Sequence, residues 1–97
     1  MPKGYAIFTE AITDEAGMNE YGRAAFPSLL SCGARVLAVD TSPEVLEGDW
    51  HGTQTVLLEF DSPEAARAWY ESQEYGKAKP IRHASATTNA AILHGLE

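Results

Sequence analysis

The sequence predicts an α+β domain in which four antiparallel strands carry two helical regions on one face. Four short segments rich in apolar and β-branched residues show the alternation that is typical of strands. Two longer stretches repeat apolar residues every three or four positions, as helices packed on a core do. The segments follow one another as strand, helix, strand, strand, helix, strand, and this order indicates the fold class.

The first strand is expected over residues 3–13. Its side chains alternate between the two faces of a sheet, with one set formed by Tyr5, Ile7 and Thr9 and the other by Ala6, Phe8 and Glu10. Both sets are mostly apolar, so neither face of this strand is clearly marked for solvent.

A helix follows and is expected to end at Gly33, because glycine tolerates the left-handed conformation common at helix C-termini. Thr13 or Asp14 is expected to cap its first turn, since a short side-chain oxygen can accept hydrogen bonds from the free amides there. The apolar stripe of this helix consists of Met18, Tyr21, Ala25 and Leu29.

The next two strands are expected over residues 35–41 and 54–60. The stretch between them is rich in turn formers and predicts a short edge piece around residues 45–47, followed by a tight loop. In the later strand Val56, Leu58 and Phe60 share one face, which makes it the most strongly patterned of the four.

The second helical region is expected to begin after Ser62 as N-cap, with Pro63 at the first helical position, where its missing amide donor costs nothing. Ser72 is expected to cap a second helical piece that continues to about His83. The last strand is expected over residues 87–95.

This order of elements is that of the ferredoxin-like fold, and it predicts one domain over residues 1–97. The helices can cover only one face of the sheet, whereas the strands are apolar on both. Because an uncovered apolar sheet face is unusual for a monomer, we expect a homodimer in which the two sheets pack face to face.

The charge balance excludes some classes of partner. The 97 residues include fourteen acidic side chains and seven Lys or Arg, for a net charge of −7. Nucleic acids and anionic membranes require clustered cations, so neither is expected as a partner. The sequence contains no secretory leader and no apolar stretch of membrane-spanning length, which predicts a cytoplasmic protein.

Metal and cofactor motifs are missing from the sequence. The three histidines, His51, His83 and His94, are too far apart for the short spacings of a metal site. No glycine-rich phosphate loop or dinucleotide fingerprint is present, so neither a metal nor a cofactor is expected. Cys32 has no cysteine partner and is expected to be a buried, inert thiol.

Two runs of residues carry a resemblance to a known family. They are the Glu47-Gly48-Asp49-Trp50 turn and the segment from Glu59 to Tyr75, with its Ala68-Trp69-Tyr70 core. With the rest of the chain they resemble the DUF1330 family of uncharacterised small proteins. The resemblance implies the dimeric α+β barrel superfamily, a scaffold that carries several unrelated chemistries. At Val39-Asp40-Thr41 the chain departs from an Arg-Gly-Gly that is frequent in the family, which argues against anion binding by this strand.

Three charged residues, Arg35, Asp40 and Glu59, occupy strand positions where we expect half-buried side chains. A buried charge is costly unless it is paired, so these groups are either structural partners or functional. Glu59 is the candidate catalytic base, with its pKa raised by an apolar pocket. The alternative is that Glu59 lies at the strand end and accepts hydrogen bonds from Arg35 or a neighbouring amide.

Aromatic residues supply the remaining candidates. Trp69 and Tyr70 share a helix face and are expected to belong to the core, in preference to a stacking wall for an aromatic ligand. Trp50 lies in a loop, where it either covers a pocket or packs across the dimer interface, and the interface is favoured. Tyr5 is a further pocket candidate.

Tyr75 and Arg82 lie on the second helical piece. They either close a pocket between helix and sheet or form solvated caps, and the caps are favoured.

Two functions from different classes fit these observations. In the first, a dimer binds or acts on a small metabolite, aromatic or not, in a pocket between helices and sheet. If this protein is catalytic, the expected reaction is proton transfer without a cofactor. In the second, a non-enzymatic dimer regulates or scaffolds another protein through its acidic surface. A roomy pocket would favour the first function, and a closed cleft without space for a ligand would favour the second.

Overall fold

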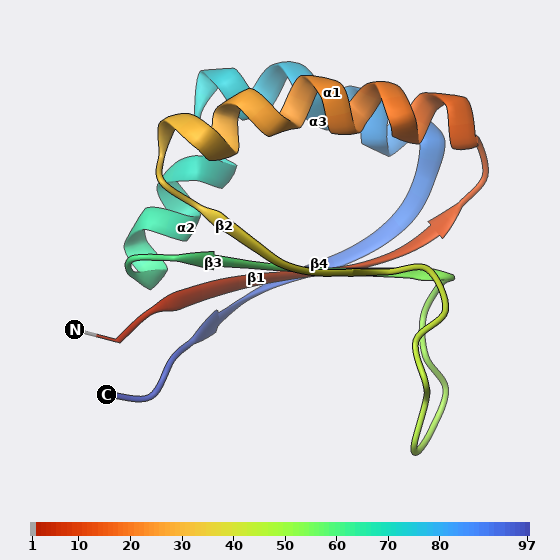
Figure 1. The fold of residues 1–97 in the computed structure, drawn as a ribbon. Coiled ribbons are helices and arrows are strands. Elements are labelled where there is room, and N and C mark those ends of the chain that lie inside the picture. Colours follow the sequence, from red (N-terminus) through yellow and green to blue (C-terminus); the bar gives the residue numbers. More distant parts are fainter. Residues whose placement is uncertain (1) are drawn as a thin grey trace.

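The computed structural model describes residues 2–97 and confirms the α+β fold class. The described residues form a four-stranded antiparallel sheet and three helices, and all three helices lie on one face of the sheet (Figure 1). The elements in chain order are β1 Gly4–Ile12, α1 Glu15–Ser31, β2 Arg35–Asp40, β3 Gln54–Phe60, α2 Pro63–Tyr70, α3 Gln73–Ser85 and β4 Ala86–His94.

The strands are ordered β2-β3-β1-β4, so β1 and β3 are central and β2 and β4 form the edges. In the antiparallel register, Phe8 of β1 lies opposite Val56 of β3 and Ala90 of β4. Residues directly opposite each other share a face, so this row points toward the helices. The β2–β3 pairing contains an irregularity between Val36 and Ala38.

Each helix begins at a polar side chain that accepts a hydrogen bond from the first turn. The pairs are Asp14 Oδ1 with Gly17 N at 3.1 Å, Ser62 Oγ with Ala65 N at 3.0 Å, and Ser72 Oγ with Tyr75 N at 3.1 Å. The expected caps are therefore confirmed, with Asp14 in place of the alternative Thr13. Each such bond satisfies an amide that has no partner within the helix.

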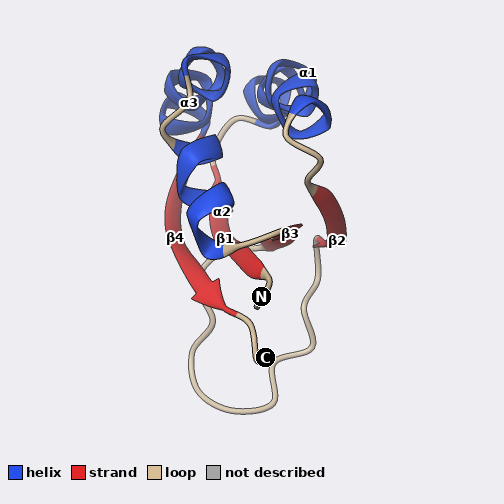
Figure 2. Ribbon diagram, turned by 90° about the vertical axis from the view of Figure 1, so that its left-hand side faces the viewer, coloured by secondary structure: helices blue, strands red, loops and turns tan. Residues whose placement is uncertain are grey.

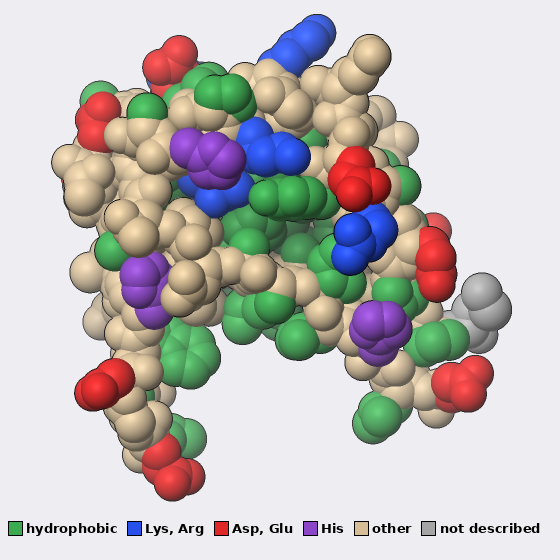
Figure 3. Space-filling view, turned by 180° about the vertical axis from the view of Figure 1, so that it is seen from behind, with side chains coloured by type: hydrophobic (Ala, Val, Ile, Leu, Met, Phe, Trp, Pro, Cys, Tyr) green, Lys and Arg blue, Asp and Glu red, His purple; other side chains and the backbone are tan. Residues whose placement is uncertain are grey.

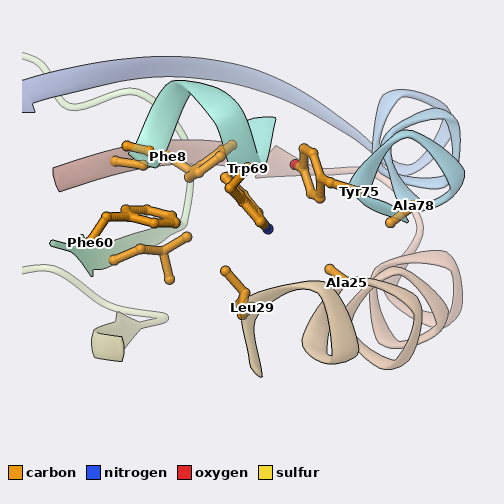
Figure 4. Packing of buried hydrophobic residues seen from close by; sticks show 10 residues of the cluster. Phe8, Ala25, Leu29, Phe60, Trp69, Tyr75 and Ala78 are labelled. Carbon is orange, nitrogen blue, oxygen red and sulfur yellow. The ribbon is translucent and has the colours of Figure 1, made fainter. Parts of the chain in front are cut away.

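The core is built around Trp69 of α2, which is only 3% exposed. Its ring lies against Phe60, with centroids 5.3 Å apart, and against Tyr75, with centroids 4.0 Å apart (Figure 4). The indole Nε1 points toward α1, where it donates a hydrogen bond to Ser28 Oγ at 2.9 Å. The core assignment of Trp69 is therefore confirmed, and its buried N–H has the partner that such a group requires.

The segment of residues 41–53 differs from expectation, because no strand forms around residues 45–47. Gly48 and Gly52 adopt φ angles of 76° and 80°, which favour turns over strand pairing. The resulting loop projects from the sheet on the side opposite the helices (Figure 1). From behind, this projection carries acidic and hydrophobic side chains, and a second projection is formed by the end of the chain (Figure 3).

Two exposure predictions are wrong. Cys32, expected to be buried, is exposed because it lies at the C-terminal end of α1, beyond the apolar stripe. Arg35 and Asp40, expected to be half-buried, are exposed because β2 is an edge strand. Every residue of β2 is exposed in the single chain, including Val36 and Val39.

Candidate functional site

The main feature of the helix-covered side is a cavity of about 650 Å³ between α1 and the sheet. α1 lies above the β2 side of the sheet, and α3 lies above β4 (Figure 2). The inner wall of the cavity includes Phe8, Leu58 and Trp69, and its outer edge includes Val39 of β2 and Phe26 of α1. These edge residues are 57% and 53% exposed, so the cavity opens to solvent between α1 and β2 through an apolar rim.

A single carboxyl group lies at the inner end of this cavity. Glu10 is 1% exposed, because the alternation along β1 places it on the same face as Ala6 and Phe8. Its Oε1 accepts a hydrogen bond of 2.8 Å from Gln54 Nε2 on the neighbouring strand. Burial raises the pKa of Glu10, while the hydrogen bond from Gln54 and the charge of Arg82 offset part of that rise.

Near Glu10 lies a chain of polar groups from α1 and α3, in which Tyr75 and Arg82 are buried and Tyr21 lines the cavity. The phenol oxygens of Tyr21 and Tyr75 are 2.7 Å apart and share a hydrogen bond, and Arg82 Nε donates to Tyr75 Oη at 3.4 Å. The Arg82 guanidinium, 3% exposed, lies 5.2 Å from the centre of the Phe8 ring. Burial raises the pKa of both tyrosines, so their phenols stay protonated at neutral pH.

The backbone around Glu10 is held by close neighbours. Gly52 packs directly against the Glu10 carbonyl with no room for a side chain, and Thr53 N donates to that carbonyl at 2.9 Å. On the other side, Thr88 of β4 lies directly opposite Glu10, and its buried hydroxyl has no hydrogen-bond partner among residues 2–97. Glu10 is therefore fixed in a small polar region within an apolar wall.

Glu59, the carboxylate favoured from the sequence, lies on the other face of the sheet. Its side chain is half-buried, with Arg35 Nε 3.3 Å from Oε1 and Tyr5 Oη donating to Oε2 at 3.2 Å. This matches the alternative in which Glu59 is a structural partner of Arg35. None of Glu59, Arg35 and Tyr5 lines the cavity.

The other predicted site residues are dispersed. Asp40 Oδ1 accepts a hydrogen bond from Ser42 N at 2.8 Å, and Trp50 Nε1 donates to Thr55 Oγ1 at 2.8 Å. Both side chains are exposed, and neither lines the cavity. Tyr75 and Arg82 are buried, so the favoured reading of both as solvated caps is wrong. Neither residue lines the cavity, so a role for them in closing a pocket stays a prediction.

The sequence interpretation missed Glu10 and Tyr21 as site residues. The signal for Glu10 was available, since it is a carboxylate in the strand set that also contains Ala6 and Phe8. A charged residue in an apolar set indicates either a strand end or a functional group. Tyr21 was recognised only as part of an apolar helical stripe, and its hydroxyl contact with Tyr75 depends on how α1 and α3 pack.

Residues 2–97 contain no cluster of His, Cys, Asp and Glu side chains suited to holding a metal ion. Within the same range, no helix combines the length and the apolar character needed to cross a bilayer.

Comparison with known families decides the classification. The model of the DUF1330 family, described as a domain of unknown function, matches residues 3–96. The chain belongs to the DUF1330 family. The resemblance seen in the sequence is thus confirmed over nearly its whole length, while no curated protein matches the chain.

Solved structures similar to this DUF1330 protein share its fold at low sequence identity. A protein of unknown function from Rhodopseudomonas palustris has a TM-score of 0.81 and 16% identity, with 99% of this chain and 84% of that chain covered. SnoaB, a cofactor-independent oxygenase from Streptomyces nogalater, has a TM-score of 0.71 and 7% identity, with 100% and 96% covered. A dimeric protein of unknown function with a ferredoxin-like fold, from Bacteroides fragilis, has a TM-score of 0.62 and 15% identity, with 95% of each chain covered.

Proposed function

We propose that this protein binds a small metabolite with an aromatic or similarly compact apolar body in the cavity between α1 and the sheet. We further propose that Glu10 is the acid–base group of this site. The observation that carries the proposal is a carboxyl group, 1% exposed, at the inner end of an otherwise largely apolar cavity. Such a combination of apolar walls and one perturbed polar group is typical of small-molecule sites.

The size of the cavity supports a small-molecule role. Its volume of about 650 Å³ lies within the range of roughly 300–1,000 Å³ that is usual for ligand pockets. A scaffolding module needs no such internal space, so the cavity favours this function over binding of another protein through the acidic surface. Met18, Phe8 and Trp69 offer apolar and aromatic surface on several sides of the space.

Glu10 replaces Glu59 in the proposed acid–base role, because only Glu10 lines the cavity. A raised pKa makes a carboxylate a stronger base than an ordinary one at neutral pH. Gln54 holds one carboxyl oxygen and so limits rotation of the group. The likeness to SnoaB shows that this fold is found in a cofactor-independent oxygenase, which is compatible with chemistry carried by side chains alone.

The cavity can be blocked at a position that tolerates a side chain. Gly22 lines it, and a Cβ added there meets no atom within 4 Å. We expect 2-naphthol to bind the unmodified protein saturably in calorimetric titration and to lose at least about tenfold in affinity in Gly22→Phe, a change of ~1.4 kcal/mol.

Gly76→Phe is the matched control, since Gly76 is also an exposed helical glycine with open space around its Cβ but lies outside the cavity. Unchanged binding in Gly22→Phe would refute the cavity as the binding site. Native mass spectrometry of protein purified without refolding should also reveal any ligand retained from the cell as an added mass.

We also propose that the protein is a homodimer formed through the sheet face opposite the helices. That face presents apolar side chains that no helix covers, namely Ile7, Leu57, Ala91 and Leu93. The loop of residues 41–53 projects past the same face, and a second copy could pack between this projection and the chain end (Figures 1 and 3). The protein from Bacteroides fragilis that shares the fold is described as dimeric. Native mass spectrometry should give about twice the chain mass of 10.5 kDa, and a monomeric mass at micromolar concentration would refute this assembly.

A further inference from the structure

The charges around the cavity restrict the ligands that it can hold. Two carboxyl side chains line it, Glu10 at the inner end and Glu15 at the exposed edge near the start of α1. Among the described residues, no Lys or Arg lines the cavity. A carboxylate or phosphate on a ligand would therefore lose its hydration without gaining a cationic partner.

Arg82, whose charge acts on Glu10, does not line the cavity. Its Nε donates to Tyr75 Oη at 3.4 Å, and its guanidinium lies 5.2 Å and 5.8 Å from the ring centres of Phe8 and Tyr21. These side chains separate Arg82 from the cavity, which it does not line. The positive charge of Arg82 thus offsets part of the rise in the pKa of Glu10, but its guanidinium is not placed to pair with an anionic ligand in the cavity.

Glu10 retains hydrogen-bonding capacity toward the cavity. Its Oε1 accepts the bond from Gln54, and no residue among 2–97 donates a hydrogen bond to Oε2. Among residues 2–97, Thr88 Oγ1 is the buried side-chain polar atom without a partner, so Oε2 of Glu10 keeps access to solvent. A ligand group with an O–H would supply the missing donor at this point.

On these observations, and resting on the proposed function, we propose that the cavity selects uncharged ligands with an apolar ring body and a hydroxyl or enol group, which donates a hydrogen bond to Glu10. Carboxylated and phosphorylated analogues are excluded by charge. The apolar rim formed by Phe26, Val36 and Val39 suits the entry of such a body, since it also lacks cations that would attract an anion.

Three bicyclic probes of similar size test the proposal at pH 7. 2-Naphthol is uncharged and donates a hydrogen bond, 2-methoxynaphthalene is uncharged and cannot donate, and 2-naphthoate is an anion. We expect calorimetric titration to give 2-naphthol a dissociation constant at least about tenfold lower than that of either other probe. Chemical-shift changes of the Glu10, Gln54 and Trp69 amides on addition of 2-naphthol should locate the binding in the cavity.

Two variants test whether the charge of Glu10 sets the preference between the probes. Glu10→Gln removes the carboxylate while keeping an oxygen that can accept from Gln54, so the preference for 2-naphthol over 2-naphthoate should shrink severalfold. Glu20→Gln is the control, because it removes one negative charge from an exposed position of α1 outside the cavity and should leave the preference unchanged.

The outcomes distinguish this proposal from the proposed function. Binding of 2-naphthoate as tight as that of 2-naphthol would overturn the selection against anions, while leaving the cavity as a ligand site. Equal binding of 2-methoxynaphthalene and 2-naphthol would overturn the hydroxyl contact with Glu10. Failure of all three probes to bind at millimolar concentration would overturn both proposals.

Discussion

Replacement of Glu10 by Gln should stabilise the protein at neutral and alkaline pH. In the folded state burial raises the pKa of this carboxyl above its ordinary value of 4.5, so the charged form is disfavoured relative to the unfolded chain. Glutamine has nearly the same shape and can still accept the hydrogen bond from Gln54. The substitution therefore removes the cost of burying a charge and keeps the local contact.

The size of the effect follows from the partners that Glu10 has. An incompletely satisfied buried polar group costs about 1–3 kcal/mol, and more when it is charged. Gln54 and the nearby Arg82 charge both reduce this cost. We expect a net gain on the order of 1 kcal/mol at pH 8, which is about 4–8 °C in Tm for a domain of this size.

The sign of the pH dependence is set by the raised pKa. Below the unfolded value of 4.5 the carboxyl is protonated in both states, so the wild-type protein and the Glu10→Gln variant should have the same stability. As pH rises through the folded pKa the wild-type protein loses the stability that the neutral carboxyl provides, and the variant does not.

The difference in stability between the wild-type protein and Glu10→Gln can be measured by thermal unfolding, followed by circular dichroism from pH 4 to 8. Glu20→Gln serves as the control. A variant less stable than wild type at pH 8 would show that attraction between Glu10 and Arg82 outweighs desolvation.

Two further substitutions test the dimer and the buried network. Leu57→Lys places a charge on the uncovered sheet face and should give a monomeric mass by native mass spectrometry. The control Leu30→Lys lies on the exposed surface of α1 and should leave the dimer intact. A dimeric Leu57→Lys protein would refute packing through this face. Tyr75→Phe removes the oxygen that accepts from Arg82 and should cost about 1–3 kcal/mol in denaturant unfolding. Tyr70→Phe should change stability by less than about 0.5 kcal/mol, and equal effects of the two tyrosine variants would argue against a structural role for the Tyr75 hydroxyl.

Local chemistry made the elements of this fold predictable. Asp14, Ser62 and Ser72 cap helices because each side-chain oxygen acts within three residues, so no distant contact is needed. The period-two pattern of β1 likewise places Phe8 toward the core whatever the strand order. The structure around residues 45–47 was harder to predict, since the apolar residues there are typical of a strand while Gly48 and Gly52 favour turns.

The candidate site depended on contacts that the sequence does not encode locally. Glu10 and Glu59 are both carboxylates in strands of similar pattern, and only the tertiary structure separates their environments. Glu59 meets Arg35 because β2 and β3 pair in one particular register. Glu10 lines the cavity because a space is left between α1 and the sheet on the β2 side.

The amino-acid sequence was enough to predict the family, the order of strands and helices along the chain, the caps and the core position of Trp69. These follow from short-range periodicity and capping, which act over a few residues. The burial of Tyr75 and Arg82 and the exposure of Cys32, Arg35 and Asp40 became clear from the three-dimensional packing alone. Burial depends on which surfaces the packing of α1, α3 and the edge strands covers, and desolvation by that packing is what distinguishes Glu10 from the other carboxylates.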